Sequence, residues 1–287
     1  MCDEADMSEF RKKGLSRRQF GTAGVAAGLA ACAPMESGAA AGGLSETIVS
    51  IPTRDGTMDA FFVHPARGKS PAVIVWPDIA GLREVFKAMA RRLAGEGYAV
   101  LVANPYYRDI AAPQFADFAD FQAQQGFEKV GPWRGKLEAP AVMSDATSLA
   151  AWLDAQGAVD RGKGIGNQGY CMGGPFTVWT AAAVPSRVRA AASFHGGGLV
   201  REGAHSPHRL LDDTRASFLF AIAQNDDAKQ PEAKAELRKA ADAAGRPAEI
   251  EIYAADHGWS VPDSPVYAQA EAERAWSRLL ALYERAL

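Results

Sequence analysis

The chain has 287 residues, is 48% hydrophobic and carries a formal net charge of −3 at pH 7. A chain of this length and hydrophobic content can bury a large core. The slight negative charge, without a basic stripe or an aromatic RNA-binding motif, argues against a nucleic-acid partner. The sequence also has no zinc-ligand spacing, P-loop or dinucleotide fingerprint, so it predicts neither a metal nor a cofactor.

Residues 1–45 have the pattern of a targeting segment rather than of a folded domain. Arg17 and Arg18 lie in a twin-arginine signature at 16–20, which an alanine- and glycine-rich stretch at 21–31 follows. That stretch is too short for a membrane span, which needs about 20 residues. The sequence L-A-A-C that ends at Cys32 resembles a lipobox, in which Cys32 becomes the lipidated N-terminus. The alternative is an ordinary twin-arginine signal, cleaved near Ala31 or later.

These patterns predict three parts of the chain. Residues 1–31 are expected to be the signal peptide, 32–45 the lipobox cysteine with a flexible tether, and 46–287 the folded domain. The protein is then exported by the twin-arginine machinery to the periplasm or cell envelope and is held at the membrane by its lipid. Cys171 would be the one thiol of the folded domain, and an unpaired thiol in an oxidising compartment indicates reactivity.

Apolar periodicity predicts the order of elements after the leader. Residues 46–52 and 59–64 alternate as the strands of an antiparallel hairpin do. Strands and helices then alternate, which is typical of a mostly parallel sheet with helices on both faces. The strands are expected near 72–76, 98–103, 164–170, 189–195, 217–223 and 249–253. The helices are expected near 82–95, 140–156, 174–183, 231–244 and 265–285.

Residues 109–139 break this alternation and are rich in Phe, Gln and Asp. A long insertion at the carboxyl end of a sheet often forms a pocket wall or a lid. The three-residue spacing of the phenylalanines fits a surface excursion with one amphipathic helix equally well. Both interpretations stay open at the level of the sequence.

Residues 169–173 read G-Y-C-M-G, with Cys171 at the centre. This is the pattern of a nucleophile elbow with cysteine in the place of the usual serine. The glycines leave room for a sharp strand-to-helix turn, which is expected to strain Cys171 and to place its thiol over a helix N-terminus. The flanking strand and helix patterns supply the required context. The alternative is a buried cysteine beside flexible glycines.

An activated cysteine needs a base, and the base needs an orienting group. The chain order found with this elbow is nucleophile, acid, histidine. That order admits His195, His205, His208 and His257. His257 follows the strand at 249–253 in a loop, as a base would, although a solvated histidine is possible there too. His195 ends another apolar strand, where it either lines the pocket or bonds to backbone.

The acid is expected at the end of the strand at 217–223, which leads into Asp226 and Asp227. Either carboxylate can orient an imidazole, and the pattern favours Asp226. An oxyanion hole combines the N–H after the nucleophile, here Met172, with one from the loop after an earlier strand. The apolar strand at 72–76 leads into such a loop, which makes Ile79 the second expected donor.

Six segments together resemble the dienelactone hydrolase family, the cysteine branch of the α/β-hydrolases. They lie at 77–81, 97–100, 104–108, 169–174, 223–226 and 256–259, and the resemblance runs from about residue 48 to the C-terminus. The resemblance implies an α/β-hydrolase fold and a triad of Cys171, Asp226 and His257. It also implies hydrolysis of a lactone or related ester through a thioester intermediate.

The resemblance also assigns residues around the substrate. Arg108 matches an arginine that binds the substrate carboxylate in the family. The alternative is that Arg108 is a structural arginine paired with an aspartate such as Asp109. Asp78 stands where the family often has a glutamate that keeps the resting thiol neutral. His195 and Trp259 are further candidates for binding substrate or modulating the site. Val261 departs from the family, since lactone-specific members have a second arginine there.

The leading interpretation is therefore a cofactor-free carboxylic ester hydrolase that acts on a small lactone or ester with a cysteine triad. One alternative is a thioesterase, acyl transferase or esterase for another small acyl substrate. Another is a catalytically idle binding module of the cell envelope that keeps the pocket. The presence of a complete nucleophile, acid and base argues against the idle module.

Overall fold

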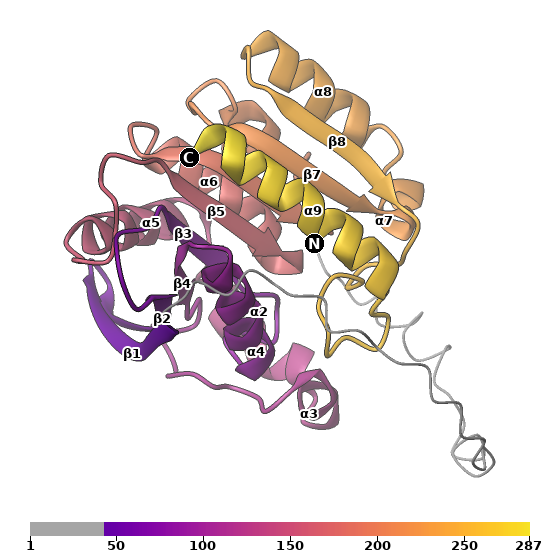
Figure 1. The fold of residues 1–287 in the computed structure, drawn as a ribbon. Coiled ribbons are helices and arrows are strands. Elements are labelled where there is room, and N and C mark those ends of the chain that lie inside the picture. Colours follow the sequence, from indigo (N-terminus) through magenta and orange to yellow (C-terminus); the bar gives the residue numbers. More distant parts are fainter. Residues whose placement is uncertain (1–42) are drawn as a thin grey trace, which may run out of the picture.

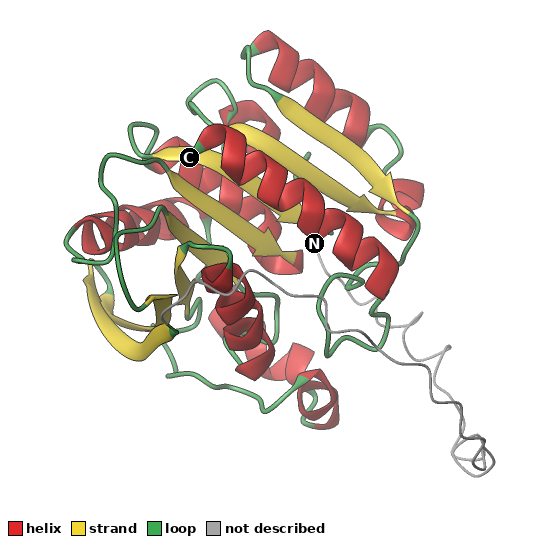
Figure 2. Cartoon of the chain, in the orientation of Figure 1, coloured by secondary structure: helices red, strands yellow, loops and turns green. Residues whose placement is uncertain are grey.

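An eight-stranded sheet runs through residues 43–287, the part of the chain that the computed structural model describes (Figures 1 and 2). The order is β1-β2-β4-β3-β5-β6-β7-β8. The strands are β1 (Leu44–Thr53), β2 (Gly56–Pro65), β3 (Ala72–Trp76), β4 (Ala99–Ala103), β5 (Ile165–Tyr170), β6 (Val188–Phe194), β7 (Ser217–Ala223) and β8 (Ala248–Tyr253). The pairs β1–β2 and β2–β4 are antiparallel and the other pairs are parallel, which confirms the predicted mostly parallel sheet.

Helices cover both faces of this sheet, as predicted. The longer ones are α2 (Glu84–Gly95), α5 (Ala139–Asp154), α6 (Gly174–Ala183), α8 (Ala233–Ala243) and α9 (Gln269–Ala286). In the parallel strands successive side chains point to opposite faces. Val73 packs with residues of α2 and α9 on one face, and Ile74 packs with residues of α5, α6 and α8 on the other. Figure 1 shows α9 lying across the sheet on the face nearest the viewer.

The insertion at 109–139 folds differently from the single amphipathic helix that its phenylalanine spacing suggested. It forms two short helices, α3 (Phe118–Ala123) and α4 (Gly126–Arg134), with Gln125 between them in a left-handed conformation (φ 54°). The phenylalanines pack on one another, Phe121 lying 5.0 Å from Phe115 and 4.7 Å from Phe127 between ring centroids. Aromatic clustering, rather than one helical face, therefore explains their spacing.

The carboxyl ends of the parallel strands meet at one edge of the sheet. Parallel α/β sheets bind their ligands at this edge. The segments that follow β3, β5, β7 and β8 there are 77–83, 171–173, 224–229 and 254–268. They contain every residue predicted for the nucleophile, base, acid and oxyanion hole.

The leader predictions fall outside the described residues. These are the twin-arginine signature, the lipobox at Cys32 and nearly all of the tether. β1 begins at Leu44, two residues before the expected start of the domain. Among residues 43–287, no helix combines the length and apolar character that crossing a bilayer requires.

Candidate active site

Cys171 occupies a sharp turn between β5 and α6, as the elbow pattern predicts. Its backbone is left-handed, with φ of 50°, and it opens the short 3-10 helix η1 (Cys171–Gly173). A Cβ on Gly169 would lie 2.0 Å from the Gly173 carbonyl oxygen, and one on Gly173 would lie 2.5 Å from the Trp76 carbonyl oxygen. Both flanking glycines are therefore required by close backbone contacts. The strained turn places Cys171 just before the N-terminus of α6, where the helix dipole favours a thiolate.

His257 and Asp226 are bonded to each other at the same edge of the sheet. The imidazole Nδ1 of His257 lies 2.7 Å from Oδ2 of Asp226. The backbone N–H of His257 also donates to Oδ1 of Asn225 at 2.8 Å, so two consecutive residues after β7 hold the histidine loop. Asp226 lies in the first turn of α7 (Gln224–Lys229), a short helix that was not among the expected elements. The neighbouring Asp227 accepts instead from Lys234 at 2.7 Å.

A cavity of about 670 Å³ lies beside these residues. Cys171, Met172, Asp226 and His257 all line it. The wall includes apolar residues and basic residues. The apolar ones include Leu137, Pro175, Phe176, Trp179, Leu199, Val200 and Leu237, and the basic ones are Arg134, Arg201, Lys229 and Lys234. Because α4 and the residues after it contribute to this wall, the insertion at 109–139 forms part of the pocket. The volume falls within the range of about 300–1,000 Å³ that is usual for small-molecule sites.

A tyrosine that the sequence analysis did not single out contacts both residues expected to supply the oxyanion donors. The Tyr106 hydroxyl donates to the Ile79 carbonyl at 2.7 Å and lies 3.4 Å from the Met172 sulfur. Tyr106 is 1% exposed, so these contacts are shielded from water. The signal in the sequence that could have identified Tyr106 was its position in the segment 104–108, which is part of the family resemblance.

His195 packs directly against His257, with 5.0 Å between ring centroids and an edge-to-face angle of 64°. Its Nε2 lies 2.9 Å from the Ser260 hydroxyl, and its Nδ1 has no hydrogen-bond partner among the described residues. Burial, with the nearby His257, holds the pKa of His195 well below its ordinary value. His195 therefore packs against the loop of His257 as a neutral ring. The backbone of His195 is strained, with φ of 41°.

Asp78 binds an arginine in the structure. Both of its carboxylate oxygens accept from Arg83, at 2.7 and 2.9 Å, and Oδ1 also accepts from the Ala80 N–H. The salt bridge holds this carboxylate at the guanidinium, and an effect of Asp78 on the Cys171 thiol stays a prediction. Arg83 itself was not a candidate in the sequence analysis.

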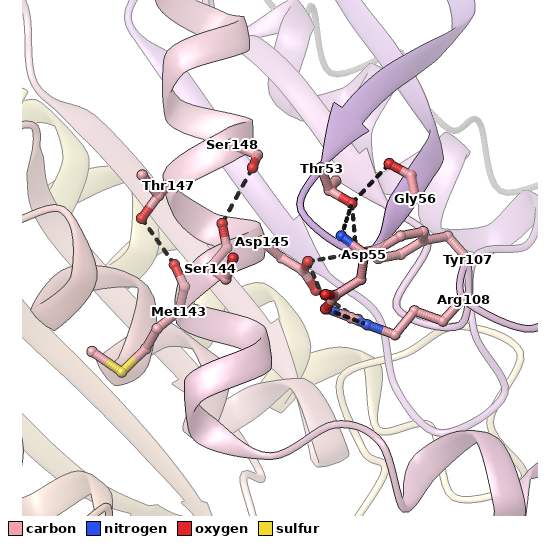
Figure 3. A network of polar contacts seen from close by, with 10 residues as sticks. All are labelled: Thr53, Asp55, Gly56, Tyr107, Arg108, Met143, Ser144, Asp145, Thr147 and Ser148. Atoms are coloured by element: carbon pink, nitrogen blue, oxygen red, sulfur yellow. Dashed lines mark hydrogen bonds and ion pairs between the residues drawn. The ribbon is translucent and has the colours of Figure 1, made fainter.

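Arg108 lies in an ion-pair network with two carboxylates (Figure 3). Its guanidinium binds Asp145 at 2.8 and 2.9 Å and Asp55 at 2.7 and 3.0 Å, and it stacks on the Tyr107 ring. Tyr107 also donates to Asp145 at 2.7 Å. These contacts fix Arg108 between two carboxylates, and its assignment as the arginine that binds a substrate carboxylate stays a prediction. The partners are Asp55 and Asp145 rather than the suggested Asp109.

Trp259 is a core residue rather than a wall of the cavity. It is 0% exposed and stacks on Tyr253, with ring centroids 4.7 Å apart. It also contacts His195 edge-on at 6.0 Å. Val261, where a second arginine was expected in lactone-specific relatives, is buried as well. Both side chains fix the histidine loop to the core by apolar packing, and a binding or modulating role for Trp259 stays a prediction.

Known proteins resemble this chain over most of its length. A protein of Salmonella typhi named "Putative carboxymethylenebutenolidase" is 29% identical over 245 residues, covering 83% of this chain and 87% of the relative. An Escherichia coli protein of the same name is 29% identical over 243 residues, covering 82% and 85%. A solved structure from Klebsiella pneumoniae, titled "Putative Dienelactone Hydrolase", superposes with a TM-score of 0.72 at 26% identity, covering 84% of this chain and 99% of that one.

The fold of the chain and its family agree. The sheet, its helices and the similarity to the solved structure establish the α/β-hydrolase fold that the resemblance implied. The family model described as "Dienelactone hydrolase family" matches residues 58–287, which is nearly the whole of the described part. The chain belongs to the dienelactone hydrolase family of carboxylic ester hydrolases.

Proposed function

We propose that the protein hydrolyses a small lactone or ester through a thioester on Cys171, with His257 as base and Asp226 as the group that orients it. The observation that carries the proposal is the 2.7 Å contact between His257 Nδ1 and Asp226 Oδ2, beside a cavity that Cys171 also lines. An acid bonded to Nδ1 leaves Nε2 to serve the nucleophile, since each ring nitrogen has a separate role. The family membership supports the same class of reaction.

The first half of the reaction forms the thioester. The Cys171 sulfur, its proton taken by His257 Nε2, attacks the substrate carbonyl carbon and forms a C–S bond. The carbonyl electrons move to the oxygen, and the resulting oxyanion accepts from the N–H groups of Met172 and Ile79. Collapse of this intermediate breaks the C–O bond to the leaving oxygen, which takes the proton from His257. In a lactone the new hydroxyl stays on the acyl group.

The second half releases the acid. His257, again neutral, takes a proton from water as the water oxygen attacks the thioester carbonyl. The second oxyanion collapses with loss of the Cys171 sulfur, which receives the proton back. Asp226 stabilises the imidazolium in both halves because its negative charge faces Nδ1. The cavity of about 670 Å³, with apolar and basic walls, suits a small acyl group with polar substituents.

Thiol alkylation coupled to a substrate panel tests the proposal. We expect iodoacetamide to modify Cys171 near neutral pH and to remove hydrolysis of lactones and aryl esters in parallel, since the same sulfur does both. Peptide mapping by mass spectrometry identifies the modified cysteine. Complete alkylation of Cys171 with undiminished turnover would exclude a thioester mechanism.

We also propose that the protein is exported through the twin-arginine route and anchored by lipid at Cys32. The support is the sequence of residues 16–32. Cys32→Ala is expected to release hydrolytic activity from the membrane fraction into the soluble fraction, because the acyl chains would be absent. Replacement of both Arg17 and Arg18 by Lys is expected to leave an uncleaved precursor in the cytoplasm. A Cys32→Ala protein that stays with the membrane in cell fractionation contradicts the lipid anchor.

A further inference from the structure

Arg83 is a buried cation whose hydrogen-bonding capacity is fully used. It is 0% exposed and lies directly before α2. A guanidinium has five N–H bonds, one on Nε and two on each terminal nitrogen. Nε donates to Asp263, Nη1 to Asp78 and the Gly81 carbonyl, and Nη2 to both aspartates, at 2.7–3.2 Å. Two carboxylates therefore hold one guanidinium, each with both of its oxygens.

The two carboxylates come from loops that are far apart in the sequence. Asp78 lies in the loop after β3, directly before Ile79, and also fixes that loop by accepting from the Ala80 N–H at 2.9 Å. Asp263 lies in the loop after β8, six residues beyond His257. The bonds from Arg83 to Asp263 thus span 180 residues and connect the loop of the expected oxyanion donor to the loop of the expected base.

A third element joins the same cluster. The N–H of Phe118, at the start of α3, donates to Oδ2 of Asp263 at 3.1 Å. The Arg83 guanidinium also lies 5.8 Å from the Phe118 ring and 5.0 Å from the Phe86 ring. The insertion that carries part of the cavity wall is therefore fixed to the same point. These two aromatic rings keep water away and leave Arg83 little freedom.

Stability alone does not account for this cluster. Buried ion pairs commonly contribute little to net stability, because the charges lose their hydration, and apolar replacements are often as stable. Here two carboxylates meet one cation, so the cluster carries a net negative charge if all three groups are ionised. Burial would lower the pKa of Arg83, but the charges and hydrogen bonds of Asp78 and Asp263 raise it above its ordinary value. Such a cluster does fix geometry. Two parallel hydrogen bonds between a guanidinium and a carboxylate set both the distance and the relative orientation of the two groups.

We propose that Arg83 is a positioning residue of the active site, which holds the Ile79 loop and the His257 loop at a fixed separation through Asp78 and Asp263. The inference rests on the roles proposed above for Ile79 and His257. The carbonyl under attack lies between the oxyanion donors and the base, so its reaction depends on their separation. A displacement of about 1 Å in such a geometry can cost about 10²-fold in rate.

Asp263→Ala is the most direct test, since it cuts the link to the histidine loop and leaves the neutral pair of Arg83 and Asp78. We expect kcat for an aryl ester to fall by about 10- to 100-fold with KM changed by less than about threefold, because binding is kept and alignment is lost. Asp263→Glu, which keeps the carboxylate, should recover part of the loss. Arg83→Met should lose at least as much, but it leaves two buried carboxylates together and can impair folding.

Arg92→Met is the matched control. Arg92 also makes a bidentate bond, to Glu273 of α9 at 2.6 and 2.7 Å, but both side chains are roughly half exposed. The kcat of the Arg92→Met variant should stay within about twofold of wild-type, since exposed ion pairs contribute little to stability. Circular dichroism and thermal melting establish that each variant is folded at the assay temperature. If Arg83→Met does not fold, Asp263→Ala still decides the question.

The outcomes separate this inference from the proposed function. Folded Asp263→Ala with unchanged kcat overturns the positioning role. A fall in kcat that only matches the unfolded fraction assigns Arg83 to general stability and overturns it equally. Cys171→Ala is assayed in the same series. If that variant is inactive while Asp263→Ala is fully active, the positioning role alone fails, whereas an active Cys171→Ala refutes the triad.

Discussion

Cys171→Ala is expected to remove nearly all hydrolysis, lowering kcat by about 10³-fold or more. Without the sulfur no thioester can form, and the remaining groups can only assist direct attack by water. His257→Ala should cost a similar factor, because the thiol then has no base and the leaving oxygen has no proton donor. Steady-state kinetics with the preferred lactone or ester measures both losses.

The double variant Cys171→Ala/His257→Ala provides the control for a shared mechanism. Residues that act as a unit lose activity non-additively, so the double variant should be little worse than either single one. Multiplicative losses would indicate that the two residues act in separate steps. Full activity in either single variant would remove that residue from the triad. Thermal melting should show that each protein is still folded, since Cys171 is a small side chain at the end of a buried strand.

The elbow turn, the histidine loop and the sheet could be predicted because their signals are local. The elbow needs glycines at 169 and 173 for steric reasons that any sequence with this turn must satisfy. The strands and longer helices lie within four residues of their expected bounds, since apolar alternation and helical periodicity reflect burial directly. The positions of Ile79, Asp226 and His257 follow because parallel strands bring their carboxyl ends to one edge.

Contacts between distant segments could not be predicted in the same way. The pairing of Arg83 with Asp263 spans 180 residues, and neither residue stands in a recognisable motif. Arg108 was assigned from the family resemblance, which gave no sign that Asp145 on α5 and Asp55 in the β1–β2 turn bind it. Trp259 follows the base in sequence, yet stacking on Tyr253 takes its ring into the core. Tertiary partners, rather than sequence position, decide what each of these side chains contacts.

The second large loss of activity is expected at Asp226, the first of the two aspartates after β7. Asp226→Asn should lower kcat by about 10²- to 10⁴-fold with a small change in KM. An amide in place of the carboxylate can donate to Nδ1, which favours the wrong imidazole tautomer and removes the charge that stabilises the imidazolium. The measurement is the pH profile of kcat/KM, in which the loss should be large at every pH where wild-type is active.

Asp227→Asn is the matched control, since it makes the same chemical change one residue along α7. Asp227 accepts from Lys234 at 2.7 Å, and Lys234 is 40% exposed, so this pair contributes at most about 1 kcal/mol. Turnover by Asp227→Asn should therefore stay within about fivefold of wild-type, a change of up to about 1 kcal/mol in barrier height. A larger loss at Asp227 than at Asp226 would exchange their roles. It would require the imidazole to leave the carboxylate that it contacts in this structure and to turn toward the neighbouring one during catalysis.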